Sequence, residues 1–294
     1  MKNLIINADD FGMSQEVNEG TEKGIKQGII TSVSIMVNMP YFKQAVQFLK
    51  KYPDISVGLH FNITEGPPLL LPRVAKNLIR EDNTFFYWSQ LIPRVAMHKK
   101  EMLKEIQAEL SAQYKLLQST GLPITHIDSH HHVHLYPSIF HVVSKFVDKQ
   151  KIHSLRGHAF NFWNLTLGTW KKPIPTQLIV NLFLLLVNIR YKNWNHLSKI
   201  NRFYDINWAK DISTEEFVEI LEKLPDGTTE FICHLATVSK TGNTKFLIPR
   251  YNTLQLLSQP LIKKHLTKNG ITLVNHQSIH QTQEQLSPIV VKNL

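Results

Sequence analysis

Short apolar runs alternate along the chain with longer segments whose apolar residues recur at helical spacing. The run at residues 4–8 predicts a buried strand, and Ser14 is placed to cap a helix that reaches about residue 27. Residues 32–37 and 55–63 are rich in β-branched side chains and predict two further strands, with a helical pattern around residues 45–49 between them. The first part of the chain therefore predicts the order strand, helix, strand, helix, strand.

The alternation continues to the end of the chain. Repeated strand–helix alternation predicts a parallel sheet, whose strands present functional residues at their carboxyl ends. Polar clusters follow at least four of the strands, so we expect an α/β fold of the barrel type rather than an open sheet, in one domain over residues 1–294. Further helices are predicted at 102–117, 137–149, 213–224 (opened by the capping-box sequence Ser213-Thr-Glu-Glu216) and about 252–268, and further strands at 124–129, 152–156, 228–234 and 271–274.

Two regions interrupt this alternation and are treated as insertions, near 64–89 and 165–211. The first holds several prolines and an aromatic group at 85–88, and it is predicted either as a lid or substrate wall or as ordinary packing. The second contains a nearly continuous apolar stretch at 178–189 with basic residues around it. This stretch is shorter than the roughly 20 residues that span a bilayer, so it predicts a buried helix, with an interfacial, lipid-facing helix as the alternative.

Composition narrows the class of protein. Apolar residues make up 43% and charged residues 19% of the chain, as in an ordinary globular protein. Cys233 is the only cysteine, which excludes an internal disulfide and a zinc site of four cysteines. The formal charge of +10 favours an anionic partner without choosing among nucleic acid, a phospholipid surface and an acidic substrate. The first residues lack the apolar region of a signal peptide, so we expect a cytoplasmic protein.

The densest chemical signal is the segment 125–134, Thr-His-Ile-Asp-Ser-His-His-His-Val-His. It places five imidazoles and a carboxylate at the end of one predicted strand, and these groups are common ligands of catalytic divalent ions. Adjacent residues of a regular strand point to opposite faces, so His130, His131 and His132 cannot all bind one ion. We expect one or two of them to be ligands, and the alternative is a solvated loop or packing residues.

Similar groups mark three other predicted strands. Asp9 and Asp10 follow the first strand. In such a pair one carboxylate is able to bind a cation while the other accepts a proton from water. Taken alone, such a pair is more often part of a turn or a helix cap. His60 lies in an apolar strand and His234 ends the segment 230–234, and either one alone indicates a packed residue. The coincidence of four such positions at strand ends favours a functional site.

These segments together resemble the motifs of the YdjC-like carbohydrate deacetylases. The resemblance spans residues 7–234, and the last predicted helix and strand also fit, so it covers nearly the whole chain. It implies a deformed (β/α) TIM-like barrel related to polysaccharide deacetylases, and a hydrolase that uses a divalent metal ion to remove N-acetyl groups from amino sugars, releasing acetate. The matching segments are Asn7-Ala-Asp-Asp-Phe-Gly12, Gly58-Leu-His60, residues 125–134 and Glu230-Phe-Ile-Cys-His234.

The resemblance also implies roles for individual residues. Asp10, His60 and His130 would hold one divalent ion, with Mg²⁺ and Zn²⁺ both suited to such ligands. Asp9 would act as the general base toward water, and His234 as the general acid toward the leaving amine.

Other residues complete the expected site. Arg156 falls where the family has a basic residue near the site, and it would orient Asp9 or hold substrate. His132, His134 and Glu230 are grouped with Arg156 as candidates for substrate binding. Leu235 stands where the family has a proline after the histidine, a departure that would alter the loop carrying His234.

The segments 178–211 and 224–230 are more similar to the hopanoid-biosynthesis-associated branch of the family than to its chito-oligosaccharide branch, which would suit a glycolipid substrate. The family implies a homodimer, and the stretch 178–189 is the candidate for peripheral membrane contact. Two alternatives stay open: a metal-dependent phosphoesterase on the same barrel, and a basic protein that binds nucleic acid or a membrane surface. Because the Lys and Arg residues are scattered and no recognition motif is found, we expect no nucleic-acid partner.

Overall fold

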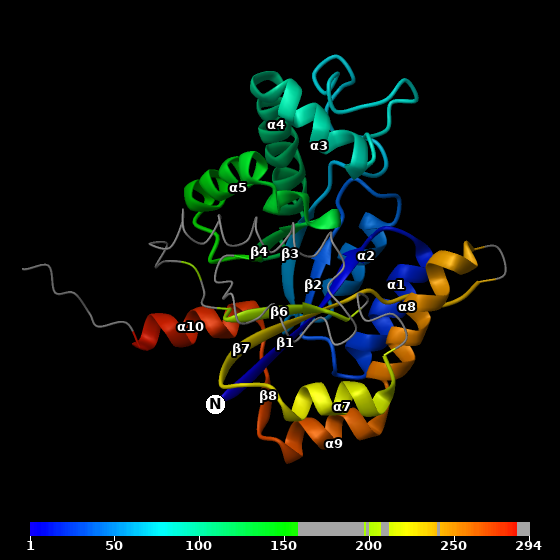
Figure 1. Ribbon diagram of the computed structural model, residues 1–294, viewed down its shortest axis with the longest axis vertical. Helices are drawn as coiled ribbons and strands as arrows, with labels where there is room; N and C mark the ends of the chain where they lie inside the picture. Colours follow the sequence, from blue (N-terminus) through cyan, green and yellow to red (C-terminus); the bar gives the residue numbers. More distant parts are fainter. Residues whose placement is uncertain (158–196, 198–199, 207–211, 240–241, 287–294) are drawn as a thin grey trace, which may run out of the picture.

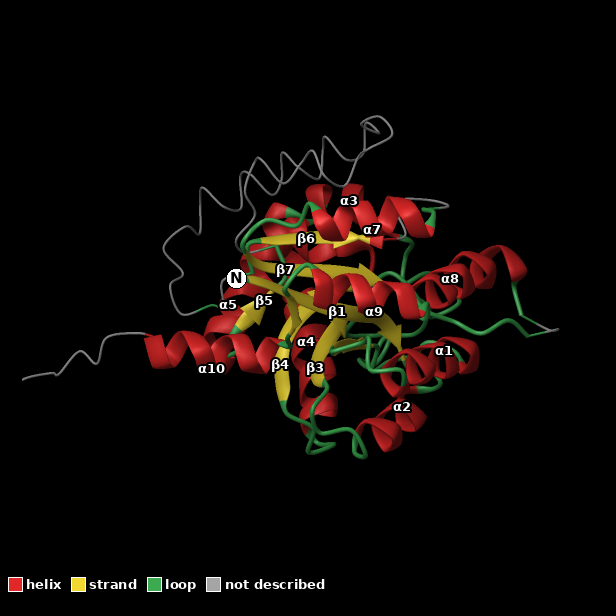
Figure 2. Cartoon of the chain, turned by 90° about the horizontal axis from the view of Figure 1, so that it is seen from below, coloured by secondary structure: helices red, strands yellow, loops and turns green. Residues whose placement is uncertain are grey.

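The centre of the structure is a parallel β-sheet that curls into part of a barrel (Figures 1 and 2). The computed structural model describes residues 1–157, 197, 200–206, 212–239 and 242–286. Within these ranges the strand order is β5-β4-β3-β2-β1-β7-β6, β8 pairs with the first residues of β1, and every ladder is parallel. The strands are β1 (Lys2–Phe11), β2 (Ser32–Ile35), β3 (Ser56–Phe61), β4 (Ile124–Ser129), β5 (Ser154–Leu155), β6 (Arg202–Asp205), β7 (Gly227–Cys233) and β8 (Ile271–Leu273).

The predicted α/β fold of a deformed barrel is confirmed in this curled parallel sheet. In the part of the chain that the structure describes, no ladder joins β5 to β6, so these strands form an open half-barrel. Because the strands run parallel, their carboxyl ends lie at one common edge of the sheet. Parallel sheets carry their functional residues at this edge.

Helices pack around the outside of the sheet and against one another (Figure 1). On one side α3, α4 and α5 form a connected layer, and on the other α1 contacts α2 and α8 while α7 contacts α9. The helices are α1 (Gln15–Lys26), α2 (Phe42–Leu49), α3 (Trp88–Met97), α4 (Lys99–Gln118), α5 (Pro137–Gln150), α7 (Thr214–Glu222), α8 (Thr244–Leu257), α9 (Pro260–Lys268) and α10 (His276–Leu286), with a 3₁₀ helix, η1 (His130–Leu135), after β4.

Most of the predicted elements are present, and their local signals work as expected. The Ser14 hydroxyl accepts from the Val17 amide at the start of α1, and Ser213 and Glu216 form the predicted capping box of α7. The single helix predicted at 252–268 is wrong, because α8 ends at Leu257 and a separate helix, α9, begins at Pro260. Proline lacks the backbone N–H that an uninterrupted helix needs, whereas it fits the first turn of a new one. The sequence pattern also did not identify α3, β6 and α10.

Apolar side chains on both faces of β1 explain its central position. Leu4, Ile6 and Ala8 are fully buried in the main core, and Ile5 is fully buried as well. A strand that is covered on both faces has a continuous apolar run rather than alternation, which is the pattern of residues 4–8.

The first predicted insertion forms the connection from β3 to α3. Phe85 is buried in the core, while the neighbouring Tyr87 and Trp88 have about half of their surface exposed, at 54% and 49%. Phe86 is partly buried against the same core, so ordinary packing accounts for two of these aromatic residues, and the lid or substrate wall stays a prediction for the exposed pair. Most of the second insertion, including the stretch 178–189, lies outside the described residues, so its membrane contact stays a prediction, as does the homodimer.

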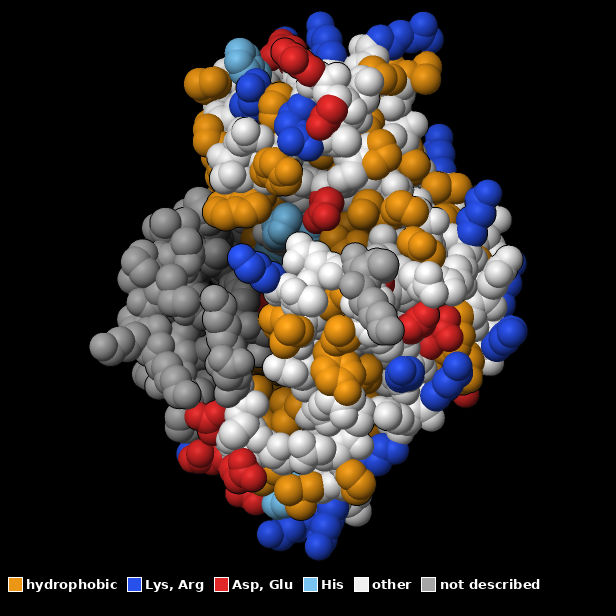
Figure 3. Space-filling view, turned by 90° about the vertical axis from the view of Figure 1, so that its right-hand side faces the viewer, with side chains coloured by type: hydrophobic (Ala, Val, Ile, Leu, Met, Phe, Trp, Pro, Cys, Tyr) orange, Lys and Arg blue, Asp and Glu red, His pale blue; other side chains and the backbone are white. Residues whose placement is uncertain are grey.

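The described helices contain none that is both long and apolar enough to cross a membrane. Lys and Arg side chains are spread around the face drawn in Figure 3 rather than gathered in one stripe.

Candidate active site

The residues predicted to hold the metal ion and to act as base and acid come from four strands and meet at one edge of the sheet. Asp9 and Asp10 lie near the end of β1, and His60 lies near the end of β3. His130 begins η1 directly after β4, and His234 directly follows β7. Residues far apart in sequence thus converge because their strands run parallel in one curled sheet.

A bulge at the end of β1 turns both aspartates toward the site. The register advances three residues on β1, from Ala8 to Phe11, against two on β2, from Val33 to Ile35. Asp10 accordingly adopts a left-handed backbone with φ of 64°, a conformation that aspartate tolerates better than most residues. A regular strand would send adjacent side chains to opposite faces, so this extra residue is what allows two successive carboxylates to serve one site.

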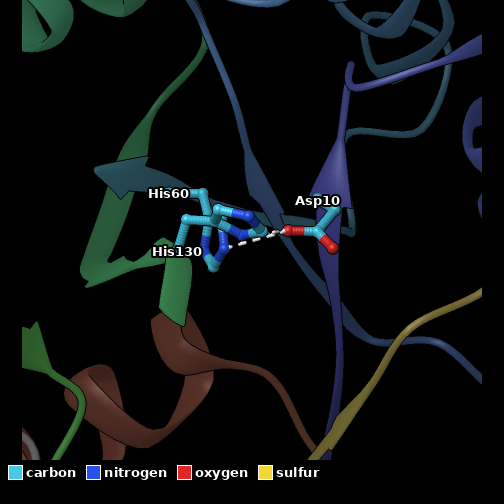
Figure 4. A group of neighbouring side chains, drawn as sticks. All are labelled: Asp10, His60 and His130. Atoms are coloured by element: carbon cyan, nitrogen blue, oxygen red, sulfur yellow. Dashed lines mark ion pairs between the residues drawn. The ribbon is translucent and has the colours of Figure 1, made fainter. Parts of the chain in front are cut away.

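Asp10, His60 and His130 form a compact group able to hold a metal ion (Figure 4). Asp10 Oδ1 lies 3.2 Å from His60 Nε2 and 2.9 Å from His130 Nδ1. All three residues are buried, and Asp10 Oδ1 and His60 Nε2 have no hydrogen-bond partner among the described residues. Buried polar atoms without partners cost free energy, and a divalent ion between them would satisfy both atoms. The structure therefore brings together the three residues predicted as metal ligands.

A second group, Asp9, His60 and Asp128, also has ligand atoms close enough for an ion. Here Arg156 already provides the positive charge, with Nη1 2.8 Å from Asp9 Oδ2 and Nη2 2.6 Å from Asp128 Oδ2. The guanidinium compensates part of their charge and occupies both Asp9 oxygens and one Asp128 oxygen, whereas Asp10 Oδ1 and His60 Nε2 have no hydrogen-bond partner in the described part of the chain. The group around Asp10 is for this reason the better candidate for the ion.

Arg156 holds Asp9 through both of its carboxylate oxygens. Nη1 and Nη2 each donate to Asp9 at 2.8 Å, and Nη2 and Nε donate to Glu230 Oε1 at 2.9 and 3.1 Å. The Asn7 side-chain amide also donates to Asp9 Oδ1, at 2.7 Å. The bidentate contact fixes the plane of the Asp9 carboxylate, which is the requirement for a positioned base.

Two partners of the candidate metal ligands were not identified from the sequence. Arg250 of α8 donates from Nη2 to Asp10 Oδ2 at 2.7 Å, and Glu65 Oε2 lies 3.0 Å from His130 Nε2. Burial alone would raise the pKa of Asp10, but the neighbouring charges of His130 and Arg250 hold it well below its usual range. The carboxylate of Asp10 is therefore ionised, with one oxygen bound to Arg250 and the other facing the histidines.

Whereas His60 lies near one oxygen of Asp10, His234 lies near the other. Its Nε2 is 3.7 Å from Asp10 Oδ2 and its Nδ1 is 3.9 Å from Asp205 Oδ1. Burial lowers the pKa of His234, so the neutral imidazole is favoured near pH 7. Leu235, in the position of the family's proline, is fully buried, and the loop still keeps His234 beside the candidate metal group.

The run of histidines after β4 separates into different environments. His131 and His132 have left-handed backbones, with φ of 54° and 53°, just after β4 ends at Ser129. The His131 ring packs on the His130 ring, with centroids 3.9 Å apart, and its Nδ1 lies 3.0 Å from the Thr64 hydroxyl. His132 Nε2 lies 3.8 Å from Asp205 Oδ2, at the side of the site that holds His234. His134 is fully buried, with Nδ1 2.5 Å from the Ser129 hydroxyl and Nε2 3.1 Å from the Arg156 carbonyl oxygen. Among the histidines of residues 130–134, His130 is the one that belongs to the candidate metal group.

Asp128 belongs to the site although it was not selected as a site residue. Its position was visible in the sequence, because it lies two residues before His130 in the same motif. Asp205 on β6 and Arg250 gave no such signal, since each reaches the site from a distant segment through tertiary packing.

Comparisons with known proteins identify the family of the chain. The sequence model of the YdjC-like protein family matches residues 3–268. The chain is 27% identical over 280 residues to a carbohydrate deacetylase of Geobacillus stearothermophilus, with 94% of this chain and 98% of that protein covered.

Solved structures include a similar fold. The crystal structure of an Enterococcus faecalis protein named for cellobiose-phosphate cleavage superposes with a TM-score of 0.76 at 25% identity, covering 95% of this chain and 98% of that one. A family 4 carbohydrate esterase from Streptomyces lividans in complex with acetate gives a TM-score of 0.45 at 11% identity, covering 94% of this chain and 95% of that one. Because the family's sequence model extends from the first strand to the end of α9, the chain belongs to the YdjC-like protein family.

Proposed function

We propose that this protein is a metal-dependent carbohydrate deacetylase that removes the N-acetyl group from an amino sugar and releases acetate. The observation that carries the proposal is the buried group of Asp10, His60 and His130, with two polar atoms that have no hydrogen-bond partner in the described structure. The Geobacillus stearothermophilus relative, named carbohydrate deacetylase, supports the choice of reaction.

In this proposal Asp10 Oδ1, His60 Nε2 and His130 Nδ1 hold one divalent ion. Two imidazole nitrogens and a carboxylate oxygen suit Zn²⁺, and the oxygen ligand with room for water also admits Mg²⁺. When bound, the ion would polarise the acetyl carbonyl and make a water molecule more acidic.

Asp9 takes the proton from the attacking water, and His234, once it has taken up a proton from solvent, donates that proton to the departing nitrogen. Support for the first role is the contact with Arg156, which fixes both Asp9 oxygens while His60 Nδ1 lies 4.0 Å away. Support for the second is the position of His234, whose Nε2 lies 3.7 Å from Asp10 Oδ2 and whose Nδ1 lies 3.9 Å from Asp205 Oδ1. The proposal thus assigns the base and the acid to two different residues near Asp10, as general acid–base hydrolysis of an amide uses.

The proposed substrate-binding residues differ in how much surface they offer. The His132 side chain is 14% exposed, whereas Arg156 and Glu230 are buried against each other and both ring nitrogens of His134 have partners inside the protein. We therefore propose that His132 contacts the sugar, and that Arg156 acts mainly by orienting Asp9.

Acetate release from a panel of N-acetylglucosamine oligomers and N-acetylglucosaminyl lipids tests the function and separates the two substrate classes. The metal-loaded protein should release acetate, chelation should abolish it, and Asp9→Asn should reduce it by at least about 100-fold. Asp54→Asn removes an exposed carboxylate and is the matched control, with unchanged activity expected. Release of phosphate from sugar phosphates without any acetate release would overturn the proposal in favour of a phosphoesterase.

A further inference from the structure

His60 and Asp128 form a buried pair across neighbouring strands. The two residues are register partners on β3 and β4, so their side chains extend from the same level of the sheet. His60 Nδ1 lies 2.7 Å from Asp128 Oδ1, and both residues are at most 1% exposed. This contact lies on the side of the imidazole opposite to Asp10.

The second oxygen of Asp128 is held by donors alone. The Ser34 hydroxyl donates to Asp128 Oδ2 at 2.6 Å, and Arg156 Nη2 lies 2.6 Å from the same oxygen. The Arg156 guanidinium keeps its positive charge, and its contact with this oxygen beside the donating Ser34 hydroxyl makes Asp128 an ionised acceptor. A hydrogen must therefore lie on His60 Nδ1, where it is donated to Asp128 Oδ1.

We propose that Asp128 is a positioning residue that keeps the hydrogen of His60 on Nδ1 and thereby reserves Nε2 for a metal ion. The inference rests on the metal-binding role of His60 in the proposed function. An imidazole that binds a metal through Nε2 must keep its remaining hydrogen on Nδ1, and an outer carboxylate that accepts this hydrogen fixes both the tautomer and the ring orientation. The same carboxylate shares Arg156 with Asp9, which joins the metal ligand and the proposed base in one network.

The arrangement of donors makes Asp128→Asn a sharp test. Ser34 and Arg156 both donate toward the Oδ2 position, so the carboxamide oxygen must take that position. The carboxamide NH₂ group then faces His60 Nδ1, which has to accept instead of donate. The hydrogen moves to Nε2 and blocks the nitrogen that faces Asp10 Oδ1. The substitution changes the volume of the side chain very little, so packing is preserved.

The experiment measures Zn²⁺ affinity by competition with a chromophoric chelator, and the ring-nitrogen protonation of His60 by ¹H–¹⁵N NMR in the metal-free and Zn²⁺-loaded protein. The His60 ring signals are assigned as those that disappear from the spectrum of the His60→Gln variant. We expect a hydrogen on Nδ1 in both states of the wild-type protein, loss of that signal in Asp128→Asn, and affinity weakened about 10- to 100-fold. Ser34→Ala is the matched control, since it removes a donor to the same carboxylate without touching His60, and it should change affinity less than about 3-fold by the same reasoning.

Wild-type affinity in Asp128→Asn, or an Nδ1 without hydrogen in the wild-type protein, would overturn the inference. The wild-type spectrum needs no variant, so a misfolded Asp128→Asn protein does not prevent the test. Neither readout uses a sugar substrate: a protein that binds Zn²⁺ as expected but releases no acetate would overturn the proposed function alone. Failure of the wild-type protein to bind Zn²⁺ would overturn both.

Discussion

Arg156 donates to both carboxylate oxygens of Asp9 at equal distances of 2.8 Å, although 147 positions separate the two residues in the chain. The contact joins the segment after β5, at one end of the strand order, to the end of β1 near its middle. It gives the proposed base a fixed plane and direction, because a guanidinium and a carboxylate meet edge to edge in one geometry.

We expect Arg156→Lys to lower kcat by about 100-fold with little change in KM, since an ammonium group keeps the charge but cannot hold both oxygens of Asp9. Steady-state kinetics on the best acetylated substrate measures both constants. Arg73→Lys, at an exposed position, is the control and should behave as wild type. A raised KM with unchanged kcat would instead assign Arg156 to substrate binding.

Arg250→Met should destabilise the metal-free protein by about 3–5 kcal/mol, because the buried Asp10 carboxylate then loses its guanidinium partner. Chemical denaturation with and without excess Zn²⁺ measures the effect. The loss should shrink when the ion is present, since the metal then compensates the charge of Asp10. An equal loss in both conditions would show that Arg250 acts through packing, for example on Phe246, whose ring lies 4.0 Å from its guanidinium.

Acid should destabilise the fold through the stacked pair of His126 and His276, whose rings lie 3.8 Å apart. Burial lowers the pKa of His126 to about 4 and that of His276 well below its usual value. The folded protein therefore binds fewer protons than the unfolded chain. The stabilising contribution is complete above about pH 6.5 and is lost as the pH falls toward 4, with roughly 3 kcal/mol attributable to His126.

Thermal unfolding between pH 4 and pH 8 tests this dependence. His276→Gln should give a flatter curve than wild type, and His98→Gln, at an exposed position, should follow the wild-type curve. If the unfolding temperatures of all three proteins changed equally with pH, groups other than the stacked histidine pair would be responsible for the acid sensitivity.

Gly58→Ala should cost about 1–3 kcal/mol of stability, because a Cβ at this position would lie 2.2 Å from His126 Nε2. The additional variant His126→Ala removes the obstructing ring and should recover part of the loss. A double-mutant cycle from urea denaturation gives the coupling, and independent effects of the two substitutions would contradict a direct clash.

Local signals in the sequence predicted the strands and most helices because each depends on neighbouring residues. The apolar run of β1, the cap at Ser14 and the capping box at Ser213 are all features of a few consecutive positions. The break at Pro260 was equally local and was overlooked. β6 gave no clear pattern, since its position depends on pairing with β7 rather than on its own four residues.

In the site, too, features that depend on neighbouring residues could be predicted, whereas contacts between distant segments could not. The residues in strand-end motifs could be selected from the sequence, and the structure brings Asp9, Asp10, His60 and His130 together. Their individual roles stay predictions. Arg250 approaches Asp10 from 240 positions away, a relation that only the packing of α8 creates. The bulge of β1 could not be predicted from the sequence either, because it is defined by the register between β1 and β2.

The three pairings of β1, with β2, β7 and β8, have a consequence for hydrogen exchange. Amides in a central strand exchange with solvent only when the surrounding sheet opens, so those of β1 should be among the slowest of the molecule. Asp9 and Asp10 lie in the bulge of this strand, between Ala8 and Phe11, which pair with Val33 and Ile35 of β2 on either side of it. Their mutual geometry should consequently persist through the local openings that expose helices at the periphery, and should be lost only with global unfolding.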